Sequence, residues 1–388
     1  MLSYWERQSF TSYQYAVIGG GLVGLSTALS LKEMDPKASV VILERGILPK
    51  GASTRNAGFA CFGSLTELLN DLDQMDADSV GQLVKDRWTG LQMLRSRVGD
   101  FQLKYQNYGG YELIFDRNDP CLDRIDEVNH LLKPIFGKEV FSFDTRLVEQ
   151  FGFNRKRVAG IVVNPLEGQL DAGEMMKSLI GLAQAQGINY QTGAYVNGFI
   201  TKGDQVQIPV SAVPVNAKSS SNETITLNAN RLAICNNAFS AQLFEEAPIT
   251  PARGQVLITE KIPNLKCKGA FHYDQGFFYF RNVGDRILFG GGRNLDILKE
   301  ETNEFGINER IQSHLLKELS ELILPGVDFG IASRWSGIMA FSKDKRPRIG
   351  LQSPLVGYAV GLGGMGVALG SHIGARLARL ICLKPENA

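Results

Sequence analysis

The sequence predicts an α/β fold of two lobes: a Rossmann-type nucleotide-binding lobe with a parallel sheet, and a second lobe built on a mostly antiparallel sheet with helices. The first lobe is indicated by an apolar run, residues 15–18, that enters a glycine-rich turn, and by a second apolar run, Val40–Leu43, that ends in Glu44. The second lobe is indicated by short apolar runs bounded by Gly or Pro, as at residues 255–258 and 286–289. A chain of 388 residues with 44% hydrophobic content can bury a core for each lobe.

The glycine-rich turn is Gly19-Gly20-Gly21-Leu22-Val23-Gly24, and each glycine of the pattern has its own reason. We expect Gly19 to allow the tight turn, Gly21 to let a pyrophosphate approach the backbone, and Gly24 to let the next helix pack on the strand. The N–H groups at that helix start favour phosphate. Glu44 lies 20 residues beyond Gly24, where a carboxylate accepts hydrogen bonds from an adenosine ribose. A chance glycine turn would lack this context, so the pattern favours a dinucleotide, either nicotinamide or flavin.

Three helices are predicted from apolar spacing and end signals, one in residues 22–29 before Pro36, one from Asp171 to Gly187, and one in residues 308–326. Three strands of the second lobe are predicted in residues 255–258, 277–281 and 286–289.

Composition limits the classes of partner. Lys plus Arg number 41 and Asp plus Glu 40, so no overall charge favours nucleic acid, and a small molecule is expected. The five cysteines are scattered, odd in number and include no CxxC pair, which argues against a disulfide framework or a zinc site and fits a reducing, cytoplasmic location. No metal site is expected. Residues 15–31 carry no charge, but they are too short to span a membrane and contain four glycines, so no transmembrane segment is expected.

Residues 51–58 favour flavin over nicotinamide. A simple nicotinamide domain would continue from Glu44 to another helix and strand, whereas this segment is rich in hydroxyl, amide and backbone donors. Ser53 and Thr54 can reach a pyrophosphate, and Gly58 lets the chain pass close to a flat ring. An ordinary polar loop is the alternative interpretation.

With these motifs the chain resembles the FAD-dependent D-amino acid oxidase superfamily, particularly its glycine oxidase, sarcosine oxidase and γ-glutamylputrescine oxidase branches. The resemblance covers nearly the whole length and rests on the GGGxVGL start, the Glu44-Arg45 pair, the segment 51–58, the turn 167–171, residues 253–256 and the end of the chain. It implies an FAD-binding domain of residues 12–75, 150–240 and 335–388, and a substrate-binding domain of residues 76–149 and 241–334. The implied FAD contacts are Gly19, Gly21, Leu22, Val23, Gly24, Glu44, Arg45, Ser53, Thr54, Arg55, Asn56, Ala57, Gly58, Val196, Gly363, Gly364, Met365 and Gly366.

The end of the chain carries a second glycine turn. Asp344, Pro347, Ile349 and Gly350 match the family's D-x-x-P-x-I-G, and residues 361–366 open a final helix. The resemblance implies that this helix start faces the pyrimidine end of the flavin ring, where it stabilises the negative charge of reduced flavin. A packing turn without cofactor contact is the alternative.

Dissociable FAD is expected. Some relatives attach flavin to a Cys or His, but residues 335–341 contain no Cys and no His precedes His130.

The resemblance implies oxidation of a primary or secondary amine or amino acid by hydride transfer to flavin N5, giving an imine that hydrolyses. Arg334, ten residues before Asp344, matches the arginine that pairs with a substrate carboxylate, although a structural arginine is the alternative. Tyr279 and Phe277 alternate on one strand and so share a face; Arg281 and His272 are weaker candidates, His272 being expected in a loop with Tyr273.

Two other functions stay open from sequence: a flavin hydroxylase that uses NAD(P)H, and a non-catalytic flavin-binding subunit. The sequence does not identify the amine, the electron acceptor (oxygen or another acceptor such as a quinone) or the oligomeric state.

Overall fold

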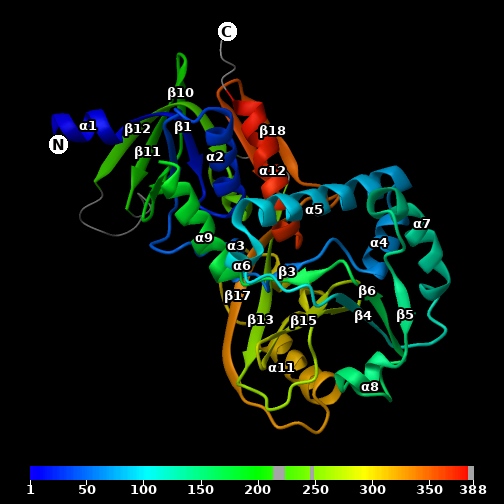
Figure 1. Cartoon of the computed structure of the whole chain (residues 1–388). Coiled ribbons are helices and arrows are strands. Elements are labelled where there is room, and N and C mark those ends of the chain that lie inside the picture. Colours follow the sequence, from blue (N-terminus) through cyan, green and yellow to red (C-terminus); the bar gives the residue numbers. More distant parts are fainter. Residues whose placement is uncertain (213–222, 245–248, 383–388) are drawn as a thin grey trace.

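The computed structural model describes residues 1–212, 223–244 and 249–382 and shows two lobes, each built around its own sheet (Figure 1). One sheet has nine strands, the other has eight, and a two-stranded ribbon of β3 (Phe59–Ala60) and β7 (Gly168–Gln169) is separate from both. The predicted fold class is confirmed.

The nine-stranded sheet contains the predicted nucleotide-binding unit. Strand β1 (Ser12–Ile18) is paired in parallel with β2 (Val40–Leu43) on one side and with β12 (Thr224–Ile234) on the other. β8 (Asn189–Gln191) and β19 (Val356–Val360) extend the parallel part. All four residues of β2 are buried, as expected for a strand covered on both faces. The antiparallel strands β9 (Tyr195–Val196), β10 (Ile200–Lys202), β11 (Gln205–Ser211) and β18 (Arg348–Ser353) complete it.

Helices α2 (Leu22–Met34) and α12 (Gly366–Ile381) lie side by side over this sheet (Figure 1). Their contact depends on small residues, because a Cβ on Gly374 would lie 2.6 Å from Ser26 Cβ and 2.8 Å from Val23 O. Both helices begin at a glycine turn, so this packing holds the two turns at a fixed separation. α9 (Ala172–Ala185) begins at the predicted Asp171 cap, whose side chain accepts hydrogen bonds from the N–H groups of Gly173 and Glu174.

The eight-stranded sheet has the order β17-β13-β16-β15-β14-β4-β6-β5 and is antiparallel except for β14 with β4. Its strands are β17 (Ile331–Phe341), β13 (Thr250–Thr259), β16 (Arg286–Gly291), β15 (Phe278–Val283), β14 (Ala270–Tyr273), β4 (Gly110–Ile114), β6 (Gly160–Asn164) and β5 (Ser142–Asp144). Helix α11 (Glu309–Glu318) continues into a π-helical turn, Leu319–Ile323, and packs on the aromatic core of this sheet.

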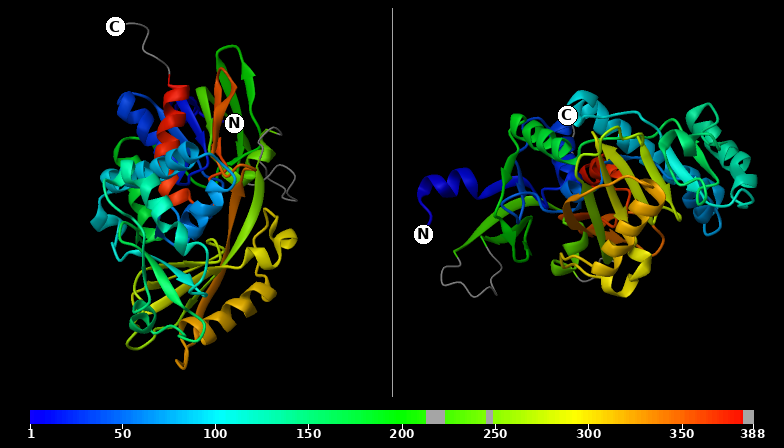
Figure 2. Two further views of the ribbon diagram at one scale, coloured as in Figure 1. Left: turned by 90° about the vertical axis from the view of Figure 1, so that its right-hand side faces the viewer. Right: turned by 90° about the horizontal axis from the view of Figure 1, so that it is seen from below.

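The remaining helices connect or flank the lobes, and α1 projects from the edge of the first lobe (Figures 1 and 2). They are α1 (Tyr4–Phe10), α3 (Ala52–Arg55), α4 (Leu65–Leu72), α5 (Ala77–Val98), α6 (Asp100–Leu103), α7 (Ile125–Phe136), α8 (Leu147–Phe151) and α10 (Ile297–Glu300), with 3₁₀ turns at Leu122–Arg124, Asn237–Gln242 and Arg293–Leu295. Within the described ranges, no helix is both long and apolar enough to cross a membrane, and no cluster of three His, Cys, Asp or Glu side chains is arranged to hold a metal ion.

The elements differ from the sequence expectations at several points. Residues 160–164, placed in the first lobe, form β6 of the eight-stranded sheet, whereas α5, placed in the second lobe, packs on α12. The boundary expected at residue 334 falls inside the continuous strand β17, which forms a long antiparallel pair with β13. His272 and Tyr273 lie in strand β14 and not in a loop, because β14 pairs with both β15 and β4.

Candidate active site

A cavity of about 640 Å³ lies where the lobes meet. One part of its wall comes from the two glycine turns and the ends of the parallel strands, and another from β13 to β17 of the eight-stranded sheet. A cavity of this size and position is typical of a small-molecule site at a domain junction.

The first glycine turn is shaped as the sequence predicted. Gly19 has a φ of +102°, and a Cβ there would lie 2.7 Å from Cys235 O. A Cβ on Gly24 would overlap the carbonyl oxygen of Gly19, so this glycine allows the close approach of α2 to β1 and does not itself line the cavity. Gly19, Gly21, Leu22 and Val23 do line it.

The acidic residue after β2 is held in place by the backbone. Glu44 is buried, and its Oε2 accepts a hydrogen bond from Gly20 N at 3.0 Å while its Oε1 accepts one from Gly46 N at 2.9 Å. Arg45 places its guanidinium 3.6 Å from the Phe239 ring centroid, and burial lowers the pKa of Arg45. Glu44, Arg45 and Val196 all line the cavity.

Segment 51–58 forms the short helix α3 and a turn against the cavity. Ser53 Oγ accepts a hydrogen bond from Leu22 N at 2.9 Å, so this segment is tied to the start of α2. Ser53, Arg55, Asn56, Ala57 and Gly58 line the cavity. Thr54 does not: its Oγ1 is buried and makes no hydrogen bond.

The second glycine turn leaves an open helix start at the cavity. Gly361 and Gly363 have φ values of +78° and +57°, and a Cβ on Gly364 or Gly366 would meet no atom within 4 Å. No side chain caps α12, so its first N–H groups and the positive end of its dipole are free to meet a ligand. Gly363, Gly364, Met365 and Gly366 line the cavity.

These features fit a dinucleotide cofactor with a flat ring. The uncapped start of α12 suits an anionic edge, and the open glycines leave room for a planar group. Asn236 Oδ1 is buried, has no hydrogen-bond partner and belongs to a residue that lines the cavity, so it offers a further polar contact.

The far end of the cavity is aromatic and carries one buried imidazole. His272 and Tyr279 are directly opposite on β14 and β15, so their side chains share a face of the sheet. The Phe59 ring centroid lies 5.0 Å from that of His272 and 5.6 Å from that of Tyr279. His272, Tyr279 and Phe277 line the cavity, although Phe277 precedes the first residue of β15.

Two predicted substrate residues are not at the cavity. Arg334 is exposed and does not line the cavity. It lies three residues before Gly337, the first cavity-lining residue of β17, which is roughly 10 Å along the strand. Arg281 is buried and donates hydrogen bonds to the carbonyl oxygens of Ala57 and Leu170, which makes it a structural residue. Burial lowers the pKa of Arg281 to about 10.

A different arginine, which the sequence reasoning missed, lines the cavity. The Arg293 guanidinium lies 4.7 Å from the Phe341 ring centroid and 5.9 Å from that of Phe277. In the part of the chain that the structure describes, no ion pair to Arg293 is found, and burial lowers its pKa. Its position directly after Gly290-Gly291-Gly292 at the end of a strand is the signal that could have identified it.

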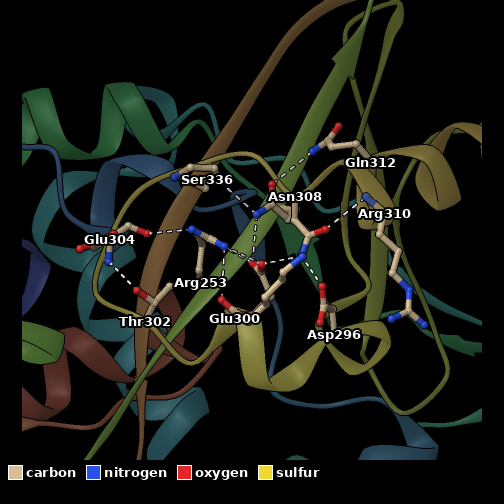
Figure 3. A network of polar contacts seen from close by, with 12 residues as sticks. Arg253, Asp296, Glu300, Thr302, Glu304, Asn308, Arg310, Gln312 and Ser336 are labelled. Carbon is tan, nitrogen blue, oxygen red and sulfur yellow. Dashed lines mark hydrogen bonds and ion pairs between the residues drawn. The ribbon is translucent and has the colours of Figure 1, made fainter.

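The segment that carries Arg293 is fixed by the polar network drawn in Figure 3. Glu300 is fully buried and accepts hydrogen bonds from Arg253, Gln255 and Asn308. Arg253 therefore has a structural role, and the segment between β16 and α11 is anchored to β13. This segment also supplies Phe305 to the cavity wall.

Two glycine turns on one cavity, with an acid after the second strand, define the class as a dinucleotide-dependent oxidoreductase. A profile of the family described as FAD dependent oxidoreductase (DAO) matches residues 14–380, and the chain belongs to this family. Gamma-glutamylputrescine oxidoreductase of Escherichia coli K12 is 24% identical over 383 residues, covering 93% of this chain and 81% of that protein.

Solved structures show the same fold at low identity. Glycine oxidase from Geobacillus kaustophilus has a TM-score of 0.74 at 19% identity, covering 96% of this chain and 95% of its own. L-proline dehydrogenase from P. horikoshii has a TM-score of 0.73 at 17% identity, with 96% and 93% covered. The resemblance inferred from the motifs is thus confirmed, and the protein is an FAD-dependent oxidoreductase.

Proposed function

We propose that this protein oxidises the C–N bond of a primary or secondary amine that carries a carboxylate, using dissociable FAD. The observation that carries the proposal is the single cavity that joins both glycine turns to His272, Tyr279 and Arg293. When bound, FAD supplies a two-electron acceptor for the substrate hydride at N5 of its ring, and the imine product hydrolyses in water.

The residues that would hold FAD come from three segments. The first turn and Glu44 suit the adenosine and pyrophosphate part, segment 51–58 suits the centre, and the second turn suits the ring. The free N–H groups of α12 stabilise negative charge there. The cavity-lining members of this set are Gly19, Gly21, Leu22, Val23, Glu44, Arg45, Ser53, Arg55, Asn56, Ala57, Gly58, Val196, Gly363, Gly364, Met365 and Gly366.

Arg293 is the proposed ligand of the substrate carboxylate. A guanidinium binds a carboxylate through two parallel hydrogen bonds, and such a pair is strengthened where water is excluded. The rings of Phe277 and Phe341 lie near the guanidinium, which is half-buried. The substrates named for similar structures support the class, since glycine oxidase, L-proline dehydrogenase and iminodiacetate oxidase are each named for an amine that carries a carboxylate.

An anaerobic reduction screen tests the proposal. FAD-loaded protein is mixed with glycine, sarcosine, proline, D-amino acids and glutamylated polyamines, and the visible flavin absorbance is followed before air is admitted. At least one amine is expected to bleach the flavin, and the rate of return of colour in air reports whether oxygen or another acceptor is used. Bleaching by NADH alone would indicate a hydroxylase, and no bleaching by any amine would indicate a non-catalytic flavin subunit.

Two matched arginine variants test the carboxylate site. Arg293→Met should raise KM for a carboxylated amine about tenfold or more, since a hydrogen bond to a charged group is worth about 1.5–3 kcal/mol. Arg334→Met removes an exposed arginine of β17 and should leave KM unchanged. Equal effects of the two variants would remove Arg293 from the site.

A further inference from the structure

His272 is a buried imidazole with an unused nitrogen at the cavity wall. The residue is 6% exposed, and its Nε2 is buried without a hydrogen bond. Oε2 of Glu167 lies 4.0 Å from Nε2. Because Nε2 faces this carboxyl group, Nδ1 is the nitrogen left for a molecule in the cavity.

Glu167 is held rigidly behind the imidazole. It is 1% exposed, and its Oε1 accepts hydrogen bonds from Phe62 N at 2.9 Å and Gly63 N at 3.3 Å. These two backbone bonds fix the carboxyl group with Oε2 directed toward His272. The arrangement of cavity, imidazole and fixed carboxyl group follows the logic of a base that is oriented by a third group.

Burial disfavours a lone charge on either residue but not on the pair. Burial raises the pKa of Glu167 to about 8, against the effect of the two backbone hydrogen bonds, and burial lowers the pKa of His272. An imidazolium beside a carboxylate has no net charge, so each residue makes the ionised form of the other less costly.

We propose that His272 accepts a proton from the substrate ammonium group, and that Glu167 is the positioning residue that orients and neutralises the imidazolium. This inference rests on the proposed amine oxidation. In this proton transfer, an N–H bond of the ammonium breaks and an N–H bond forms at Nδ1 of His272. The hydrogen on Nε2 faces Glu167 throughout. No electron leaves the substrate. The neutral amine then has the lone pair that an ammonium lacks and that hydride loss from the adjacent carbon requires.

The charge environment sets the direction of the pH dependence. Below a pH of about 8 Glu167 gains a proton, and the imidazolium loses its counter-charge; proton acceptance therefore improves as pH rises through this range. The other titratable groups on the elements packed around His272 are Cys61, Glu67, Glu112, Tyr279 and Arg281. Of these, Glu67 favours the imidazolium and lines the same cavity.

The test compares pH profiles of kcat/KM for His272→Asn, Glu167→Gln and the control His130→Asn, which alters an exposed histidine. With the best amine of the screen, His272→Asn should lower kcat/KM about 10²–10⁴-fold near neutral pH. Above a pH of about 8, where Glu167 is already ionised, the loss should shrink about tenfold per pH unit as free amine replaces ammonium. A loss that is equal at every pH, or a profile like that of His130→Asn, would overturn the assignment.

Glu167→Gln keeps the shape and the acceptor for Phe62 and Gly63 but removes the charge, so it tests the pair without the larger change at His272. It should lower kcat/KM less than His272→Asn does, and it should shift the pH profile of kcat/KM. Flavin absorbance per chain confirms that each variant is loaded. If amines fail to reduce the wild-type flavin, the proposed function fails; if they reduce it and His272→Asn follows wild type at all pH values, only this inference fails.

A readout apart from activity is histidine NMR of the loaded protein. The chain has four histidines, so the signal lost in His272→Asn identifies this imidazole. In the wild type this signal should also shift as Glu167 titrates near pH 8, and that second step should be absent in Glu167→Gln. An unchanged His272 titration in Glu167→Gln would remove Glu167 from the assignment.

Discussion

Gly374→Ala tests whether the packing of α12 on α2 positions the cofactor site. The added Cβ would lie 2.6 Å from Ser26 Cβ and 2.8 Å from both Thr27 N and Val23 O. Two of these three contacts are with backbone atoms, so α12 must move away from α2 by several tenths of an ångström. Overpacking of this kind destabilises a protein by about 1–3 kcal/mol. Because the first turns of both helices line the cavity, FAD affinity should fall as well.

The matched control is Gly181→Ala on α9, where a Cβ would meet no atom within 4 Å. Alanine in an open helical position should stabilise the protein by about 0.5–1 kcal/mol. Thermal unfolding of the loaded proteins and fluorescence titration of the FAD-free proteins with FAD measure both effects. If Gly374→Ala unfolds at the wild-type temperature and binds FAD as tightly as wild type, the close contact does not position the site and the reasoning is refuted.

Three further predictions concern buried or capping groups. Burial raises the pKa of Glu112 to about 7, above the 4.5 of a free carboxyl. Its contribution to the free energy of unfolding is therefore complete below about pH 4.5 and declines as pH rises to about 7, by up to about 1.4 kcal/mol per pH unit. Glu112→Gln should flatten this decline in urea unfolding curves. Ser53→Ala removes the acceptor for Leu22 N and should cost about 1 kcal/mol and weaken FAD binding in the same titration. Glu300→Gln leaves Arg253 without its carboxylate, so we expect the free energy of unfolding to fall by about 3–5 kcal/mol and KM for carboxylated amines to rise. An unchanged KM would show that this network does not position Arg293.

Local sequence signals predicted the elements whose structure depends on neighbours in the chain. The strand Val40–Leu43 has the predicted bounds, and the helix after the first glycine turn ends before Pro36. Gly24 and Asp171 have the predicted structural roles, because a close helix–strand approach and an N-cap are set within a few residues.

The substrate side could not be predicted in the same way, because it depends on contacts between distant segments. Arg334 and Arg293 are the same residue type, and only the position of each strand relative to the cavity decides which one lines it. His272 was expected in a loop, whereas its pairing with Glu112 on β4 is a parallel register that no local pattern specifies. The contact of His272 with Glu167 likewise joins residues far apart in the sequence.

The central claim is that the two glycine turns bind opposite ends of one dissociable FAD. The most direct measurement is the flavin content of the purified protein before and after incubation with FAD, followed by acid precipitation. We predict one FAD per chain with visible flavin absorbance, all of it released into the supernatant by acid. Protein that acquires no flavin absorbance would contradict the claim itself, and colour that stays with the precipitate would show a covalent bond in place of dissociable binding.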